Sequence, residues 1–262
     1  MATYLDRILA AHRSAAAAEP RQLDGLIARA AAEPPCRGFR SAIAAAAAGD
    51  ARLAVVAEVK RRSPSRGDLA PGLDPAGLAA AYAAGGAACL SVLTDAEFFG
   101  GSPADLAAAR AACPLPVLRK DFTVSSHDVA DARLMGADAV LLIAAALDDA
   151  DLRAFVDLAR SLGLDALVEV HDEAEVDRAL AAGADLVGVN QRDLVTFEVD
   201  RERAARLAPL LPAGVVRVAE SGVAGPADAA ALAAAGYHAV LVGEWLVRSG
   251  DPAAAVRSLR CS

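Results

Sequence analysis

The stretch Gly183-Ala-Asp-Leu-Val-Gly-Val-Asn190 is one of four similar segments that recur about every 50 residues along the chain. The other copies are GAACLSVL at 86–93, GADAVLLI at 136–143 and GYHAVLVG at 236–243. Each copy follows an alanine-rich stretch typical of a helix, at 75–84, 126–135, 172–182 and 226–235. The glycine suits the position just after a helix, and the apolar run suits a buried parallel strand. Repetition on this scale indicates an architecture built from repeated units.

Four further strand-like segments alternate with these copies, and each has an ionisable residue at or next to its end. They are LAVVAEVK at 53–60, PVLRK at 116–120, DALVEV at 165–170 and VVRVAE at 215–220. Together with the apolar runs at 88–94, 138–144, 185–190 and 239–243 they make eight strands separated by helical stretches. Eight such units predict a (β/α)8 TIM barrel, in which the carboxyl ends of all strands meet at one mouth. The charged strand ends therefore predict a site at that mouth.

The chain length of 262 residues agrees with one barrel, which needs about 250 residues. We expect 1–262 to form a single domain, with 1–50 as an N-terminal helical extension that is interrupted at 33–35 by Glu-Pro-Pro. The alternative fold is an open doubly wound sheet, which would place a GxGxxG turn after its first strand. The turn at 60–68 reads KRRSPSRGD instead, a basic loop that we expect to be solvated. This turn favours the barrel.

Composition argues against several classes of function. The formal net charge of −8 disfavours nucleic-acid binding, which needs a basic surface. No apolar run reaches the roughly 18 residues of a membrane span, and the charged first segment is unlike a signal peptide. The cysteines, at 36, 89, 113 and 261, form neither a CxxC pair nor a zinc-ligand spacing. We therefore expect a cytoplasmic protein without disulfides, with Cys89 in the core.

Polar side chains at the strand ends are the candidates for chemistry. Glu58 and Lys60 share one face of the first strand, because side chains alternate along a strand. A surface ion pair would be the better explanation of a single such pair, because most charged residues are solvated. Similar residues recur at the ends of other strands, however: Lys120, Glu169, Asn190 and Glu220. Their recurrence favours a shared site in the barrel mouth.

Glycine turns follow the last two strands, at Ser221-Gly222 and Gly243-Glu244. In barrels these two loops often bind phosphate, because glycine lets backbone N–H groups approach the anion. Ordinary turns also use glycine, so this pattern alone is weak. The four histidines show no metal-ligand spacing and no serine lies in a GxSxG motif. We expect neither a metal site nor a serine nucleophile.

Six short motifs, in order along the chain, resemble those of the indole-3-glycerol-phosphate synthase family. They are EVKRRSPSRG at 58–67, SVLTDAEFFGGS at 91–102, LRKDF at 118–122, VEVH at 168–171, VNQRDL at 189–194 and AESGV at 219–223. Gln191 departs from the asparagine that is more frequent in that family, and we expect its side chain to point away from the pocket.

The resemblance implies a reaction of tryptophan biosynthesis that needs no cofactor. An anthranilate carrying an open deoxyribulose 5-phosphate chain closes to an indole ring, and carbon dioxide and water leave. By resemblance, Lys120 is the general acid and Glu169 the general base, while Lys60 contacts anionic groups of the substrate and Glu58 and Asn190 support the site. The partner is a phosphorylated small molecule, with no nucleic acid and no membrane. Transient contact with other enzymes of the tryptophan pathway is a further expectation.

The resemblance also implies roles for the residues that would surround the substrate. Arg192 would hold the anthranilate carboxylate and Phe99 and Phe122 would form apolar walls, while Glu220 and Ser221 would line the pocket. The phosphate would be held by four residues: Ser63, Gly222, Gly243 and the backbone of Glu244.

Two alternative functions stay open at this point. Phosphoribosylanthranilate isomerase and other phosphate-binding barrels share the glycine loops, but are not expected to carry the whole set of strand-end motifs. A non-catalytic barrel that only binds a metabolite is the second alternative. Such a degenerate relative should have lost one of Lys60, Lys120 and Glu169, and all three are present.

Overall fold

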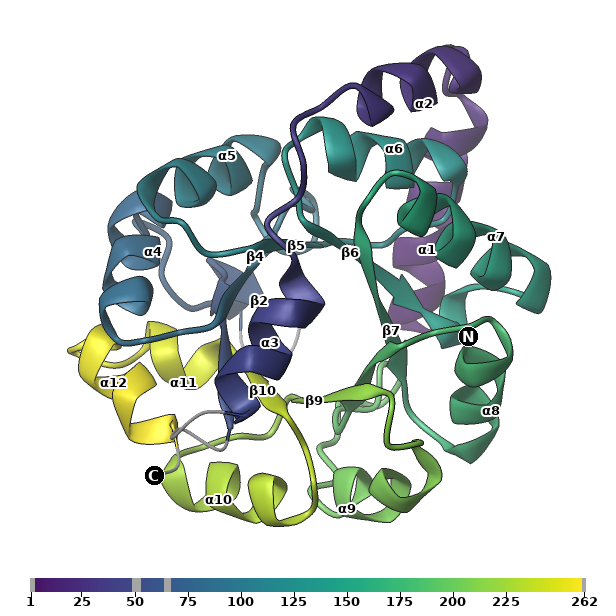
Figure 1. Ribbon diagram of the computed structural model, residues 1–262. Coiled ribbons are helices and arrows are strands. Elements are labelled where there is room, and N and C mark those ends of the chain that lie inside the picture. The colour runs from purple at the N-terminus through teal and green to yellow at the C-terminus, as the bar shows by residue number, and fades with distance from the viewer. Residues whose placement is uncertain (1–2, 49–52, 64–66, 261–262) are drawn as a thin grey trace.

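Eight parallel strands form a closed barrel in the computed structural model, which describes residues 3–48, 53–63 and 67–260 (Figure 1). The strands follow one another around the barrel in chain order: β1 (Ala54–Val59), β4 (Cys89–Leu93), β5 (Val117–Lys120), β6 (Ala139–Ile143), β7 (Asp165–Val170), β8 (Leu186–Asn190), β9 (Val216–Glu220) and β10 (Ala239–Val242). Each lies within a predicted run, and β10 pairs with β1 to close the ring. The TIM barrel is confirmed, and the open doubly wound sheet is excluded.

Helices between the strands cover the outside of the barrel. They are α4 (Pro75–Ala84), α5 (Pro103–Ala112), α6 (Ser126–Leu134), α7 (Asp149–Ser161), α8 (Glu173–Ala181), α9 (Arg203–Leu207), α10 (Pro226–Ala234), α11 (Glu244–Val247) and α12 (Pro252–Leu259), with short 3-10 turns at Ala144–Ala146 and Ala208–Leu210. The side chains of Ser102, Asp148 and Asp172 cap the helices that follow them, as serine and aspartate often do at helix N-termini. The four repeated glycines have φ between +84° and +91°, which a residue with a Cβ adopts only under strain.

A small hairpin after β1 was not predicted from the sequence. It pairs β2 (Arg62–Ser63) with β3 (Gly67–Asp68), and residues 64–66 of the predicted basic loop lie outside the described residues. Arg61 forms an ion pair with Asp105, and Arg62 donates to the backbone carbonyl of Glu97. The expectation of a simply solvated loop is therefore wrong for these two arginines, which fasten the hairpin to the neighbouring βα unit.

The apolar residues form two clusters, one on each side of the strands. The larger cluster lies between the strands and the outer helices. The smaller fills the barrel interior, where it includes Val56, Cys89 and Leu167 from three different strands. Because side chains alternate, residues two and four positions further along these strands point into the same interior. The interior is thus apolar at its base and becomes polar only at the carboxyl ends.

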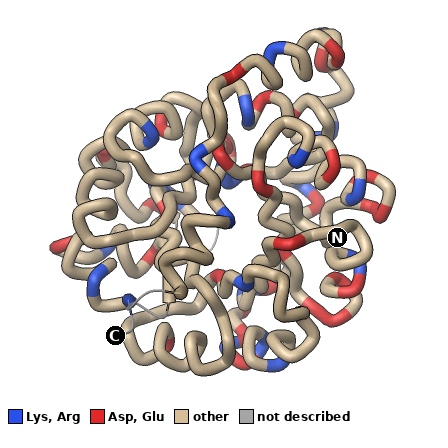
Figure 2. Tube along the Cα trace, in the orientation of Figure 1, with Lys and Arg blue, Asp and Glu red and all other residues tan. Residues whose placement is uncertain are grey.

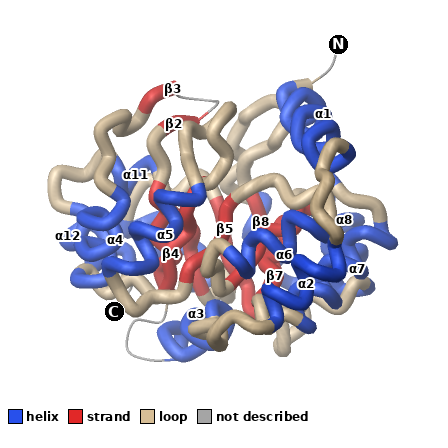
Figure 3. Tube along the Cα trace, turned by 90° about the horizontal axis from the view of Figure 1, so that it is seen from above, coloured by secondary structure: helices blue, strands red, loops and turns tan. Residues whose placement is uncertain are grey.

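The N-terminal extension wraps around the barrel from its mouth to its floor. It contains α1 (Tyr4–Ala17), α2 (Leu23–Ala31) and α3 (Phe39–Ala48), which occupy most of the predicted helical segment 1–50. Figure 3 shows α1 on the side of the hairpin and α3 on the opposite side, while α2 packs beside α6. Phe39 and Ile43 of α3 are fully buried against the interior cluster. The extension therefore closes the floor and flanks the mouth.

Acidic and basic residues are mixed over the outside of the barrel. Figure 2 shows acidic and basic positions interspersed around the ring of helices rather than gathered in one basic stripe. Within the described ranges, no helix is both long enough and apolar enough to cross a membrane. Three cysteines, Cys36, Cys89 and Cys113, are free thiols, and Cys89 is in the core as predicted. Cys261 lies outside the part of the chain that the structure describes.

Candidate active site

A cavity of about 770 Å³ opens at the carboxyl ends of the strands. All fourteen residues singled out from the sequence line it: Glu58, Lys60, Ser63, Phe99, Lys120, Phe122, Glu169, Asn190, Arg192, Glu220, Ser221, Gly222, Gly243 and Glu244. They come from strands or loops on every side of the barrel. The structure therefore brings residues from 58 to 244 together around one hollow, while the individual roles assigned to them stay predictions.

Lys120 is the centre of the charged part of the cavity. Its Nζ lies 2.7 Å from Oε2 of Glu169 and 2.8 Å from Oε2 of Glu220. The amide of Asn190 donates to the other oxygen of Glu169, over 3.0 Å. Each of these residues is the last inward-facing position of its strand, or next to it, so the barrel interior itself sets their orientation.

Lys120, Glu169 and Glu220 shift one another's pKa values in different directions. Burial alone would lower the pKa of Lys120, but the two carboxylates outweigh it and raise that pKa. Burial opposes ionisation of Glu169 as well, yet the Lys120 ammonium lowers the pKa of Glu169 to about 2. For Glu220, burial dominates and, with the neighbouring charge of Glu169, raises the pKa to about 7. Lys120 and Glu169 thus form the charged pair, and Glu220 exchanges its proton near neutral pH.

Lys60 and Glu58 form a second ion pair, with 2.5 Å between Nζ and Oε1. Both side chains line the cavity, as the alternation along β1 predicts. A Cβ at Gly243 would come within 2.2 Å of that Glu58 oxygen, so glycine is needed there to leave room for the pair. Lys60 and Lys120 are the only lysines in the sequence. Every other cationic side chain except histidine is an arginine, so both side-chain ammonium groups lie in this cavity.

Aromatic and apolar side chains form another part of the wall. The rings of Phe99 and Phe122 lie 6.2 Å apart between centroids, at an angle of 38°. Arg192, after β8, is held on both sides: its backbone N–H donates to Asn190 Oδ1 and its Nη1 donates to the carbonyl of Phe197, over 3.0 Å in each case. Aromatic rings and a fixed guanidinium in the same cavity suit an aromatic acid.

Tight turns form the end of the cavity that is nearest β9 and β10. Ser221 and Gly222 have φ of +64° and +77°, so the turn after β9 is left-handed at two successive residues. Two arginines that the sequence did not single out, Arg201 and Arg248, also line this region. Arg248 lies 3.7 Å from the Glu244 carboxylate, four residues earlier, so the acid beside the turn is partly neutralised.

Other lining residues were also missed from the sequence. They are mostly apolar side chains and loop residues, including Leu93, Asp95, Asp121, Leu141, Ile143, Leu194, Phe197 and Trp245. The apolar ones carry no local signal beyond membership of a strand or loop. Gln191, by contrast, is buried and does not line the cavity, and its Nε2 donates to the carbonyl of Ser221 over 2.8 Å. Its side chain points away from the pocket, as expected.

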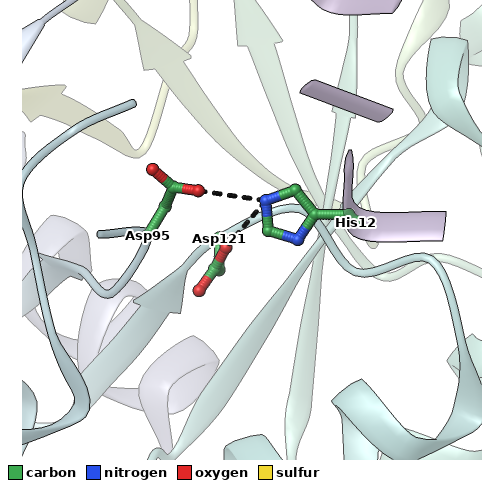
Figure 4. Close-up of side chains that lie close together, drawn as sticks. All are labelled: His12, Asp95 and Asp121. Carbon is green, nitrogen blue, oxygen red and sulfur yellow. Dashed lines mark hydrogen bonds and ion pairs between the residues drawn. The ribbon is translucent and has the colours of Figure 1, made fainter. Parts of the chain in front are cut away.

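His12 fastens α1 to the rim of the cavity, as Figure 4 shows. Its Nε2 lies 3.0 Å from Asp95 Oδ2 and 3.9 Å from Asp121 Oδ1, and its ring packs 5.5 Å from that of Phe122. Three potential metal-ligand atoms therefore lie close together. The remaining oxygen of Asp95 accepts two backbone N–H groups, and Asp121 is paired with Arg119. These bonds support a structural tie between α1 and the loops after β4 and β5.

Replacing His12 with glutamine should remove a pH-dependent part of the stability. Burial lowers the pKa of His12, but its hydrogen bond to Asp95 and the charges of both aspartates raise it overall. A raised pKa means that the contribution is complete below about pH 6.5 and is lost as the pH rises through the folded-state value. The free energy of unfolding of the wild type should exceed that of the variant by about 1 kcal/mol at most near pH 6, and by less at pH 9. Urea titrations at the two pH values would show it, and an equal difference at both would contradict the tie.

Comparison with known proteins identifies the family. The family model described as indole-3-glycerol phosphate synthase matches residues 5–259. The chain belongs to this family. A relative of that name from Nocardioides sp. is 62% identical over 205 residues, which cover 78% of this chain and 79% of the relative. The synthase of Mycobacterium avium is 53% identical over 260 residues, covering 98% of this chain and 94% of the relative. Indole-3-glycerol phosphate synthases are carboxy-lyases of tryptophan biosynthesis.

Solved structures outside the synthase family share only the fold. Thiamine phosphate pyrophosphorylase from Pyrococcus furiosus aligns with a TM-score of 0.60 at 16% identity, over 80% of this chain and 95% of that one. N-acetylmannosamine-6-phosphate 2-epimerase from Clostridium perfringens aligns with a TM-score of 0.58 at 15% identity, over 74% of this chain and 87% of that one. Both likenesses support the barrel and carry no argument about activity.

Proposed function

We propose that the cavity in the barrel mouth closes 1-(2-carboxyphenylamino)-1-deoxyribulose 5-phosphate to indole-3-glycerol phosphate, with loss of carbon dioxide and water. Membership of the synthase family supports the overall reaction. The observation that carries the assignment of chemistry is the cluster of Lys120, Glu169 and Glu220 inside one cavity that also holds Lys60. The alternative of a degenerate, non-catalytic barrel is disfavoured, because the acid and base candidates are in contact rather than dispersed.

Lys120 is suited to the first step, in which the ring carbon that bears the carboxylate attacks the sugar ketone. The carbonyl electrons move to the ketone oxygen, which becomes negative and needs a proton. An ammonium whose pKa is raised keeps its charge until that oxyanion forms, and it can then stabilise the oxygen and donate to it. Asn190 and Glu169 hold Lys120 and its surroundings in position, so little reorganisation is needed when the negative charge develops.

Glu169 is suited to the later proton removal. After carbon dioxide has left, the new hydroxyl departs as water with a proton from an acid, and a base removes a proton so that the new five-membered ring becomes aromatic. The pKa of Glu169, lowered to about 2, keeps it an ionised carboxylate near neutral pH. Glu220, with its pKa raised to about 7, is the less suitable base because it is partly protonated.

The two ends of the cavity suit different anionic groups of the substrate, the phosphate at one end and the carboxylate at the other. One end of the cavity is lined by the left-handed turn at Ser221 and Gly222, the turn at Gly243, and Ser63. Arg201 and Arg248 add positive charge there, so this end suits the phosphate. Ser63 Oγ is buried and has no hydrogen-bond partner among the described residues, so it has a free donor for a phosphate oxygen. Arg192 and Lys60 are left to hold the anthranilate carboxylate, between the walls formed by Phe99 and Phe122.

The remaining assignments rest on the family and the composition. We infer a single domain over 1–262 with 1–50 as its extension, a cytoplasmic location, and transient contact with other enzymes of the tryptophan pathway. No cofactor is assigned, since the proposed steps use only proton transfers by side chains of this chain.

Turnover by the purified protein tests the proposal directly. In metal-free buffer without nucleotide, the protein should convert the carboxyphenylamino-deoxyribulose phosphate to a product with indole fluorescence. The same substrate without its phosphate should turn over with a much higher KM, because the contacts at Ser63 and Gly222 are lost. Folded protein, verified by circular dichroism, that gives a flat fluorescence trace would reject the assignment.

A further inference from the structure

His171 lies between two carboxylates at the end of β7. It is two residues beyond Glu169 and directly follows β7, which ends at Val170. Its Nδ1 lies 3.1 Å from Oε2 of Glu175, on α8, and its Nε2 lies 3.6 Å from Oε1 of Glu169. The side chain is only 12% exposed and does not line the cavity. No role follows for it from the proposed reaction.

The contacts of the two ring nitrogens determine the protonation state of the His171 imidazole. Oε2 of Glu175 already accepts the backbone N–H of His171 over 2.7 Å, so it is an acceptor and Nδ1 must donate to it. Nε2 is buried and has no hydrogen-bond partner among the described residues, and the nearest charged oxygen is that of Glu169. A neutral imidazole has one N–H, which would leave a lone pair of Nε2 facing a carboxylate. A second proton turns that repulsion into attraction.

We propose that His171 is a positioning residue, held as an imidazolium between Glu175 and Glu169, whose charge keeps Glu169 ionised and oriented. This inference rests on the proposed role of Glu169 as the base. His171 acts through Glu169 and does not itself touch the substrate.

The charged groups around the ring agree with this assignment. Glu169 faces it from β7 and Glu175 from α8, while Arg203 on α9 opposes them. Burial also lowers the pKa of His171, but the hydrogen bond and charges of the two glutamates outweigh both effects and raise it. In return, the charge of His171 lowers the pKa of Glu169, next in size to the charge of Lys120 among the groups that do so.

The reaction provides a reason for a second cation beside the base. Lys120 is the main charge that stabilises the Glu169 carboxylate, and as the acid it gives up its proton during turnover. Until it regains that proton, Glu169 would be a buried carboxylate beside a neutral amine, and its pKa would rise. The imidazolium of His171 does not take part in that transfer. It therefore keeps Glu169 ionised through the interval in which Lys120 is neutral.

Nuclear magnetic resonance of the imidazole groups tests the charge state without any turnover. The chain has four histidines, so the signals of His171 in 15N-histidine-labelled protein can be assigned from their loss in His171→Gln. We expect both ring nitrogens of His171 to be protonated at pH 6 and the ring to titrate above 6.5. Glu169→Gln and Glu175→Gln should each lower that pKa, by about 1 unit or more, because each removes an adjacent negative charge. A singly protonated ring at pH 6, or a titration unaffected by Glu169→Gln, would overturn the proposal whether or not the protein turns the substrate over.

The kinetic test distinguishes a charge effect from a structural one. His171→Gln should lower kcat at pH 5.5 by at least about tenfold, the equivalent of one pKa unit, with KM within about threefold. The loss should shrink as the pH rises through the pKa of His171, because the wild-type ring then becomes neutral as well. His127→Gln, the same change at a residue of α6 that does not line the cavity, should leave kcat unchanged. A loss in His171→Gln that is the same at every pH would show a merely structural role and overturn the proposal. If that variant does not fold, the titration in Glu169→Gln still decides.

Discussion

Replacing Lys120 with methionine should lower kcat by at least ~100-fold, the lower part of the range for loss of a general acid. Methionine fills much of the same volume, so the expected loss comes from the missing ammonium rather than from a cavity. That ammonium lies within hydrogen-bonding distance of both Glu169 and Glu220. Its removal also takes the main cation away from both buried carboxylates, so their pKa values should rise, but the charge of His171 still lies beside Glu169. The main expected loss is therefore that of the acid.

The matched control for this variant is Lys60→Met, because Lys60 is the only other lysine of the chain and lines the same cavity. Its nearest carboxylate is that of Glu58, and it does not form an ion pair with Glu169 or Glu220. We expect this variant to raise KM for the substrate and to lower kcat by less than Lys120→Met does. Steady-state kinetics on both variants would measure the difference. A larger loss of kcat in Lys60→Met would exchange the two assignments, and near-normal kcat in Lys120→Met would remove it as the acid.

Much of the site could be predicted from the sequence because strand periodicity and strand ends are local properties. Alternation places Glu58 and Lys60 on one face, and a parallel barrel then brings that face to the same mouth as Glu169 and Glu220. The helix caps and the repeated glycines follow from equally local rules, and the structure confirms them. Family motifs provided the roles, which spacing alone does not determine.

Contacts that depend on how the barrel closes could not be predicted. Periodicity says which face a side chain takes, but not that Lys120 is within reach of Glu220 one hundred residues away. The position of α1 beside the mouth depends on the path of residues 32–38, which periodicity does not predict. The ion pair between His12 and Asp95 therefore has no signal in the sequence. His171 belongs to a recognised motif, yet only the coordinates show that α8 provides a second carboxylate on the other side of its ring.

Four arginines illustrate the same limit. Arg61, Arg62, Arg201 and Arg248 all lie outside the eight barrel strands, and the sequence gives no reason to treat them differently. The structure uses the first two to fasten the hairpin after β1 and places the other two on the cavity wall. A basic residue in a loop near a strand end is thus a weaker indication of a cavity residue than a charged residue within the strand. The strand fixes the direction of a side chain, and the loop does not.

Glu169→Gln should lower kcat by at least ~100-fold, with the loss nearly constant from pH 6 to pH 9, because an amide cannot ionise. The substitution is nearly isosteric, and its carbonyl oxygen can still accept the hydrogen bond from Asn190. Lys120 retains Glu220 as its partner, and without the neighbouring negative charge the pKa of Glu220 should fall from about 7. The ion pair is thereby replaced rather than abolished, so the protein should fold and bind substrate with a similar KM.

Glu173→Gln is the matched control, since it makes the same change at an exposed position on α8, four residues further along the chain. It should leave kcat and KM at their wild-type values. If Glu169→Gln retained kcat within about tenfold of the wild type, Glu220 would become the candidate base, and kcat of the variant should then fall as the pH falls through the lowered pKa of Glu220. If both carboxylates could be replaced without loss, proton removal would not be carried by this cluster at all, and the chemical step would have to be assigned to the Glu58–Lys60 pair on the opposite strand of the mouth.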